Sequence, residues 1–249
     1  MKNTLSNKRL KDIVEFISHL NLDQASTEKL TADEINNLLI IDEAFTHSSS
    51  NNSINYENLE FLGDAVLRLI ASDFIKEQYP KMKVGERSEL RAQLVSDQWL
   101  ENVGTKINII KILIMGPKAH SDTSARGTIK AEATEALIGA LYETLGKLEP
   151  IKNWLIPFWS KRSEEVLSDP HRENYKSALQ EWSQGKGFSI PQYETNECHK
   201  EHANPNRFFC TVFIEDHAKG EGFGGSIKQA EKEAAKNALR NLEESHFQL

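Results

Sequence analysis

The stretch YENLEFLGDAVL, residues 56–67, joins an apolar helical pattern to three acidic side chains. A helix turns by about 100° per residue, so Glu57, Glu60 and Asp64 lie within about 60° of one another. A second, apolar stripe, which we expect to face the core, comprises Leu59, Leu62, Val66 and Leu69. Like charges at this spacing repel, and partial burial raises the pKa of carboxyl groups. An acidic face beside a core therefore requires an explanation.

A second helical stretch, GTIKAEATEALIGALY (residues 127–142), repeats the arrangement. Glu132 and Glu135 stand three residues apart, directly before the apolar run, and Gly139 would let another helix approach closely. On one helix alone, a solvated acidic surface is an equally good interpretation. Two such helices packed side by side would bring four or five carboxylates together, and this favours a shared acidic cluster.

Carboxylate oxygens without His or Cys are the ligands of hard cations. This donor set indicates Mg²⁺, with Mn²⁺ as a substitute, rather than zinc. Such a cation activates water and stabilises charge on phosphate oxygens, and its usual use with this donor set is phosphodiester hydrolysis. The cluster therefore predicts a metal-dependent phosphodiesterase.

The rest of the chain divides into two regions of different periodicity. Apolar spacing is helical from residue 8 to about residue 167, which predicts an all-α domain. Further helices in this region are expected over 56–79, 86–103, 129–145 and 151–167. After the break at Asp169-Pro170, residues 172–242 read as α-β-β-β-α. Within it we expect strands in 191–200 and 206–216, a turn over 218–226 leading into a third strand, and a final helix with Ser226 as its N-cap.

The composition limits the class of protein. Among 249 residues there are 30 Lys and Arg against 37 Asp and Glu, a net charge of −7. This argues weakly against a general polyanion binder but allows a local basic face. The start lacks the apolar core of a signal peptide, and the apolar run 107–116 is shorter than the ~20 residues that span a bilayer. We expect a cytoplasmic protein without membrane contact.

The acidic motifs resemble those of ribonuclease III. The matching stretches, in family order, are THSS (46–49), NYENLEFLGDAVL (55–67), GERSELRAQLVS (85–96) and AEATEALIGALY (131–142). The resemblance implies an endonuclease domain over 1–168, a linker at 169–171 and a double-stranded-RNA-binding domain over 172–244.

The resemblance also implies roles for individual residues. The metal ligands would be Glu60, Asp64, Glu132 and Glu135, with Asp64 and Glu135 the main catalytic residues. Glu57 would assist at the substrate cleft. Phe61 matches the aromatic residue that enters the partner subunit of the dimer, although a plain core position is the alternative. The family usually has Asp at position 132, so we expect Glu132→Asp to be tolerated and Glu132→Gln not.

The RNA-binding residues implied for the second domain are Gln180, Gln184, His202, Lys228 and Lys232. Uncharged amides suit the 2′-hydroxyls of an RNA minor groove, and a lysine at a helix N-terminus suits phosphate. Without the resemblance, a solvated lysine row paired with Glu231 or Glu233 would be favoured. The family often has two lysines where this helix starts, but here one is Ile227. Residues 172–244 carry 10 Lys and Arg against 12 Asp and Glu, so we expect modest, salt-sensitive RNA affinity.

The two cysteines give no disulfide framework. Cys198, His199, His202 and Cys210 do not have the spacing of zinc ligands, and we expect the cysteines to be small hydrophobes on neighbouring strands.

The sequence thus predicts a homodimeric, Mg²⁺-dependent endoribonuclease specific for double-stranded RNA. The resemblance implies 5′-phosphate and 3′-hydroxyl products with short 3′ overhangs, a role in processing ribosomal RNA precursors and other structured RNAs, and no small-molecule cofactor. The alternative is an inactive double-stranded-RNA-binding protein that retains the fold.

Overall fold

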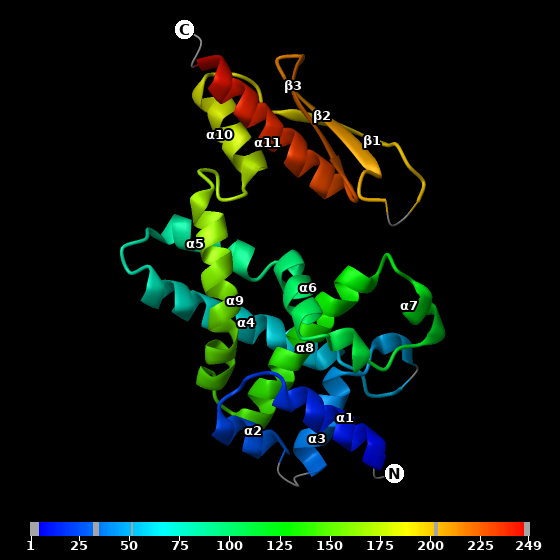
Figure 1. The fold of residues 1–249 in the computed structure, drawn as a ribbon. Helices are drawn as coiled ribbons and strands as arrows, with labels where there is room; N and C mark the ends of the chain where they lie inside the picture. The colour runs from blue at the N-terminus through cyan, green and yellow to red at the C-terminus, as the bar shows by residue number, and fades with distance from the viewer. Residues whose placement is uncertain (1–4, 32–34, 51, 202–203, 247–249) are drawn as a thin grey trace. The chain divides into compact units, whose positions relative to one another are not determined.

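The computed structural model describes residues 5–31, 35–50, 52–201 and 204–246 (Figure 1). It divides into two compact units, Met1–Val166 and Leu167–Leu249. The domain limits drawn from the sequence stay a prediction. In the described part of the chain, no helix is both long enough and apolar enough to cross a membrane.

Helices are the regular secondary structure of the described residues of the first unit, apart from a single bridge between Thr46 and Ile114. Its elements are α1 (Asn7–Ser18), α2 (Gln24–Thr31), α3 (Ile35–Ala44), η1 (Ser48–Ser50), α4 (Glu57–Gln78), α5 (Val84–Leu94), α6 (Asp97–Lys106), η2 (Ile109–Lys111), α7 (Pro117–Ser121), α8 (Arg126–Leu145) and α9 (Glu149–Ser168). The expected all-α class is confirmed.

The single helix expected over 86–103 is wrong, because the chain breaks there into α5 and α6. Ser96 causes the break: its backbone is extended and its hydroxyl accepts a hydrogen bond from the N–H of Trp99 at 3.3 Å. This is an N-cap, which starts a new helix. The apolar residues on both sides of Ser96 continue the helical spacing, so the periodicity of the sequence does not reveal this break.

Helix α8 forms the centre of the first unit and packs against α3, α4 and α6, most extensively against α4 (Figure 1). Twelve of its residues are buried. Helix α4 buries Leu59, Val66 and Leu67 against this core, but Leu69, expected to face the core, is 56% exposed. The buried face of α4 includes Gly63 and Ile70, so it is rotated slightly from the stripe expected.

The second unit is an antiparallel sheet covered on one face by helices. Its elements are α10 (Tyr175–Gly185), β1 (Gln192–Glu197), β2 (Phe208–Ile214), β3 (His217–Gly224) and α11 (Ile227–His246), with strand order β1-β2-β3. Cys210, Val212 and Ile214 pack into a core with the alanines of α11. The expected α-β-β-β-α order is confirmed, as is Ser226 as the cap of α11, whose hydroxyl accepts from the N–H of Gln229.

The turn expected over 218–226 is wrong, because most of this stretch is β3 itself. Gly220, Gly222 and Gly224 alternate along the strand, and a Cβ on any of them would lie 2.3–2.4 Å from a backbone nitrogen of α11. The glycines are therefore required by the close approach of strand and helix, not by a turn.

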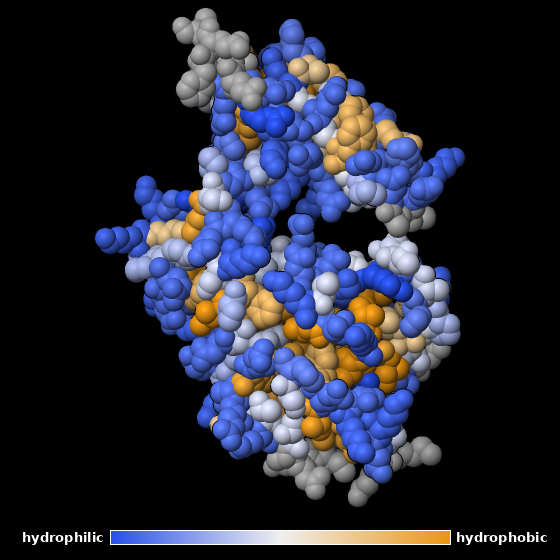
Figure 2. All heavy atoms as spheres, in the orientation of Figure 1, coloured by the Kyte–Doolittle hydropathy of each residue, from blue (hydrophilic) through white to orange (hydrophobic). Residues whose placement is uncertain are grey.

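The opposite face of the sheet carries aromatic side chains. The rings of Phe209 in β2 and Phe223 in β3 lie 4.8 Å apart, and Phe223 is half exposed. Figure 2 shows hydrophobic atoms exposed on the strand side of this unit. Cys210 is buried in β2, as expected, whereas Cys198 follows the end of β1 and is exposed, so its expected place on a strand is wrong.

Candidate active site

One cavity of about 540 Å³ in the first unit collects every acidic residue expected at the metal site and the substrate cleft. It is lined by Ser48, Tyr56, Glu57, Glu60, Phe61, Asp64, Glu132 and Glu135. The lining of this cavity therefore carries five carboxylates and no basic side chain.

A close helix crossing brings these carboxylates together. Gly63 of α4 lies against the backbone of Glu135, and Gly139 of α8 lies against the backbone of Leu59. A Cβ added at Gly63 would stand 1.8 Å from the carbonyl oxygen of Glu135. Because Gly63 sits directly before Asp64 in α4, the crossing holds Asp64 beside Glu135.

The crowding of charge raises the pKa of carboxyl groups on both helices. Burial, followed by the charges of Asp64 and Glu60, raises the pKa of Glu135 to about 8. Burial, followed by the charge of Glu132, also raises the pKa of Glu60. These carboxylates repel one another across the cavity, and a cation placed among them would relieve that repulsion.

Arg68 partly offsets the repulsion between the carboxylates at one side of the cavity. Its Nε lies 2.7 and 2.9 Å from the two carboxylate oxygens of Asp64, one helical turn away. Arg68 also lowers the pKa of Glu135, although less than the burial and the acidic neighbours raise it. Both members of the pair are substantially exposed, so the interaction contributes little stability.

Tyr56 holds another of the carboxylates. Its hydroxyl donates a hydrogen bond of 2.5 Å to Oε2 of Glu132. Burial and then this hydrogen bond raise the pKa of Tyr56, so the phenol stays a donor. Neither Tyr56 nor Arg68 was expected from the sequence to belong to the site. The position of Arg68 four residues after Asp64 was a usable signal, whereas Tyr56 and Glu132 are 76 residues apart in the chain.

The donor set fits a hard divalent cation, since only carboxylate, hydroxyl and phenol oxygens line the cavity. As placed, however, no group of three or more His, Cys, Asp or Glu side chains among the described residues is arranged to hold a metal ion. Two of these carboxylates have partners in the protein: Glu132 accepts a hydrogen bond from Tyr56, and Asp64 pairs with Arg68.

The raised pKa of Glu135 predicts how metal-free stability depends on pH. In the unfolded chain its pKa is near 4.5, whereas in the fold it is about 8. The stability that protonated Glu135 contributes to the fold is therefore fully present below about pH 4.5 and is lost as the pH rises through about 8. In EDTA, the Tm of the wild type should fall relative to that of Glu135→Gln between about pH 5 and pH 9. Parallel Tm curves from thermal unfolding would contradict this.

The residues predicted to bind RNA lie in the second unit. Gln180 and Gln184 are exposed on α10, and Lys228 is exposed in the first turn of α11. Lys232 instead forms an ion pair with Glu173 at 2.9 Å, which is neither of the partners expected. His202 lies outside the described residues.

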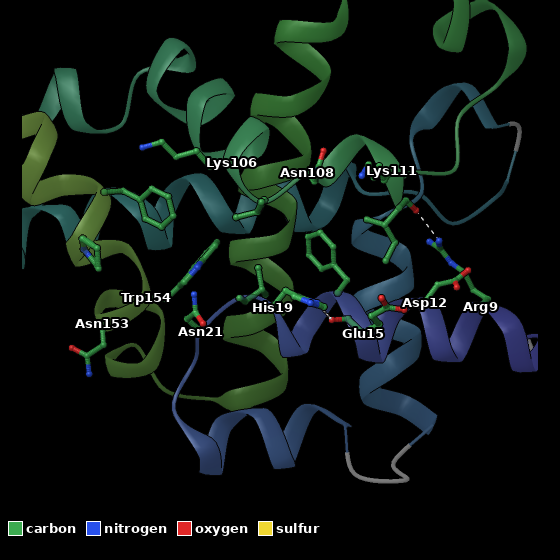
Figure 3. Close-up of a pocket in the computed structure, with 16 residues that line it drawn as sticks. Arg9, Asp12, Glu15, His19, Asn21, Lys106, Asn108, Lys111, Asn153 and Trp154 are labelled. Atoms are coloured by element: carbon green, nitrogen blue, oxygen red, sulfur yellow. Dashed lines mark hydrogen bonds between the residues drawn. The ribbon is translucent and has the colours of Figure 1, made fainter.

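A larger cavity of about 770 Å³ lies elsewhere in the first unit, between α1, the α6–η2 segment and α9 (Figure 3). It contains none of the residues predicted from the sequence. Acidic side chains of α1, including Asp12 and Glu15, and the lysines Lys106 and Lys111 both line it. The guanidinium of Arg9 is held by Asp42 and the carbonyl oxygen of Ile112. The larger cavity therefore mixes acidic and basic side chains, whereas the smaller one is lined by carboxylates and by no basic side chain.

The chain is similar to known proteins along most of its length. Residues 37–152 match a family model described as ribonuclease-III-like, and residues 175–242 match the double-stranded RNA binding motif. Ribonuclease 3 of Prochlorococcus marinus is 52% identical over 238 residues, covering 96% of each chain. Ribonuclease 3 2 of Synechocystis sp. is 37% identical over 203 residues, covering 82% of this chain and 83% of its own. A solved nuclease domain of ribonuclease III from Campylobacter jejuni is 30% identical, with a TM-score of 0.48, covering 56% of this chain and 96% of its own.

Proposed function

Because the chain belongs to the ribonuclease III family, we propose that it is a double-stranded-RNA-specific endoribonuclease with its active site in the acidic cavity between α4 and α8. The observation that carries this proposal is the meeting of acidic side chains from two separate helices in one cavity that no basic side chain lines. Such an arrangement costs stability without a cation, because the buried carboxylates repel one another.

Mg²⁺ is the proposed cofactor, with Mn²⁺ able to substitute. The ligands would come from Glu60, Asp64, Glu132 and Glu135. When bound, the cation supplies activation of water and stabilisation of charge on phosphate oxygens. The protein holds the carboxylates at fixed positions through the glycine crossing, and Glu57 at the exposed start of α4 borders the path of the RNA.

Hydrolysis breaks the bond between phosphorus and the 3′ oxygen, and leaves a 5′-phosphate and a 3′-hydroxyl. The second unit presents Gln180, Gln184 and Lys228 to the duplex, and Lys232 joins them on leaving Glu173. His202 completes the proposed contacts. Structured transcripts in the cytoplasm, ribosomal RNA precursors among them, are the proposed substrates.

A homodimer is proposed because one site cuts one strand. Phe61, on the rim of the cavity, is 83% exposed, which contradicts a core position and is unusual for so large an apolar side chain. An exposed aromatic residue beside an active site is well suited to insertion into a partner. Two copies related by a two-fold axis would present two sites to the two strands and would leave short 3′ overhangs.

We expect Phe61→Ser to weaken dimerisation by at least about 100-fold, since a buried aromatic anchor contributes several kcal/mol to an interface. Sedimentation equilibrium measures the dissociation constant. Val84→Ser, at an apolar residue of α5 that is also largely exposed, is the matched control and should leave it unchanged. An unaltered dimer of Phe61→Ser would remove this residue from the interface.

Incubation of purified protein with duplex RNA in Mg²⁺, in Ca²⁺ and in EDTA tests the proposed activity. Cleavage in Mg²⁺ alone, with binding in Ca²⁺, is expected. Binding without cleavage in Mg²⁺ would favour the alternative, an inactive RNA-binding protein. That alternative is disfavoured because repelling carboxylates cost stability, yet all five remain in the cavity.

A further inference from the structure

We propose that Tyr56 is a positioning residue for Glu132, holding the glutamate by its hydroxyl so that a free carboxylate oxygen takes a defined place in the acidic cavity. This inference rests on the proposed function. It concerns the one ligand position at which this chain departs from the usual aspartate and therefore has a longer side chain to control.

Tyr56 is itself rigidly placed. It is 1% exposed, and its ring packs edge-on against the ring of His47 with centroids 5.3 Å apart. Its N–H donates to the carbonyl oxygen of Thr46 at 2.9 Å, and its own carbonyl oxygen accepts from the N–H of Glu60 at 2.8 Å. Because the backbone is held on both sides and the ring is buried against His47, the phenol hydroxyl is directed to one point, which is Oε2 of Glu132.

The hydrogen bond leaves Glu132 able to bind a cation. A carboxylate has two oxygens with about four acceptor positions, and the phenol occupies one of them on Oε2. Oε1 has no hydrogen bond in the described structure and stays available. The same bond removes most of the rotational freedom of a side chain with three rotatable bonds, which would otherwise oppose metal binding.

The bond also connects the two helices of the site. Tyr56 directly precedes α4, whereas Glu132 belongs to α8, so the hydroxyl fixes a ligand of one helix relative to the start of the other. An outer partner that orients a ligand in this way contributes to metal affinity without touching the metal, and its loss weakens affinity about 10- to 100-fold.

A double-mutant cycle tests the proposal by metal affinity rather than activity. Mn²⁺ binding to the full-length protein without RNA is measured by isothermal titration calorimetry for the wild type, Tyr56→Phe, Glu132→Gln and the double variant. We expect Tyr56→Phe to weaken binding by about 10-fold in the wild-type background and to have no further effect with Glu132→Gln. Phenylalanine keeps the ring contact with His47, and unchanged thermal unfolding verifies that the fold is intact.

A second background sharpens the test. Glu132→Asp shortens the side chain by one methylene, out of reach of the phenol, so adding Tyr56→Phe to it should change Mn²⁺ affinity by less than about twofold. Wild-type affinity in Tyr56→Phe, or an equal loss in all three backgrounds, overturns the role of Tyr56 alone. Failure of the wild type to bind Mn²⁺ overturns the proposed metal site as well, so the two failures are distinguishable.

Discussion

Replacement of Glu135 by glutamine is expected to lower the rate of duplex-RNA cleavage in Mg²⁺ by at least about 1,000-fold, which corresponds to about 4 kcal/mol of transition-state stabilisation. The amide keeps the size of the side chain but carries no charge. Because Asp64 and Glu60 act on Glu135 electrostatically, it stands where acidic side chains from both helices converge. Glutamine at this position removes a ligand without opening a cavity.

The RNA affinity of Glu135→Gln should stay within about threefold of the wild type, because the residues proposed to bind RNA lie in the second unit. Single-turnover cleavage measures the rate, and filter binding in Ca²⁺ measures affinity. Glu143→Gln is the matched control: it makes the same change on the same helix at an exposed position outside the cavity. Cleavage by Glu135→Gln within tenfold of the wild-type rate would exclude Glu135 as a metal ligand.

The acidic cavity could be predicted from the sequence because the residue spacing of both of its helices is visible there. Spacings of three and four residues place Glu57, Glu60 and Asp64 on one face whatever the tertiary structure. Gly139, one turn after Glu135, indicated a close helix approach. Helix periodicity and a small residue at the crossing therefore contain the essential geometry of the site.

The hydrogen bond that Tyr56 donates to Glu132 could not be predicted in the same way. A hydrogen bond between Tyr56 and Glu132 depends on the angle and register at which α4 and α8 cross, which no local pattern encodes. The exposure of Leu69 has the same origin, since the buried face of α4 follows α8 and not an ideal stripe. The third strand was expected too late in the chain for a different reason: the alternating glycines of β3 are normally turn signals.

Gly63→Ala is expected to destabilise the protein by about 3 kcal/mol or more, a large part of the stability of a typical domain. The new methyl group would stand 1.8 Å from the carbonyl oxygen of Glu135, which is backbone and cannot rotate aside. Helices α4 and α8 would have to separate, and the core between them would lose packing on both sides of the crossing.

Urea unfolding of Gly63→Ala, compared with Gly85→Ala, measures this effect. Gly85 also lies in a helix, α5, but a Cβ there meets nothing within 4 Å. Its replacement should therefore stabilise the protein by up to about 1 kcal/mol, the ordinary helix preference of alanine over glycine. Equal urea midpoints for the two variants would mean that α4 and α8 can separate at little cost. The backbone contact between these helices would then not set their separation.

The same crossing links the stability of the fold to the proposed metal site. Gly139→Ala would place its methyl group 2.1 Å from the carbonyl oxygen of Leu59, at the other side of the same crossing. Once one substitution has separated the helices, the second has less left to disturb, so the double variant should lose less stability than the sum of the two single losses.

Since Asp64 follows Gly63 and Glu135 precedes Gly139 by one turn, any such separation also moves the carboxylates of the two helices apart. Mn²⁺ affinity should therefore fall in each glycine variant that still folds.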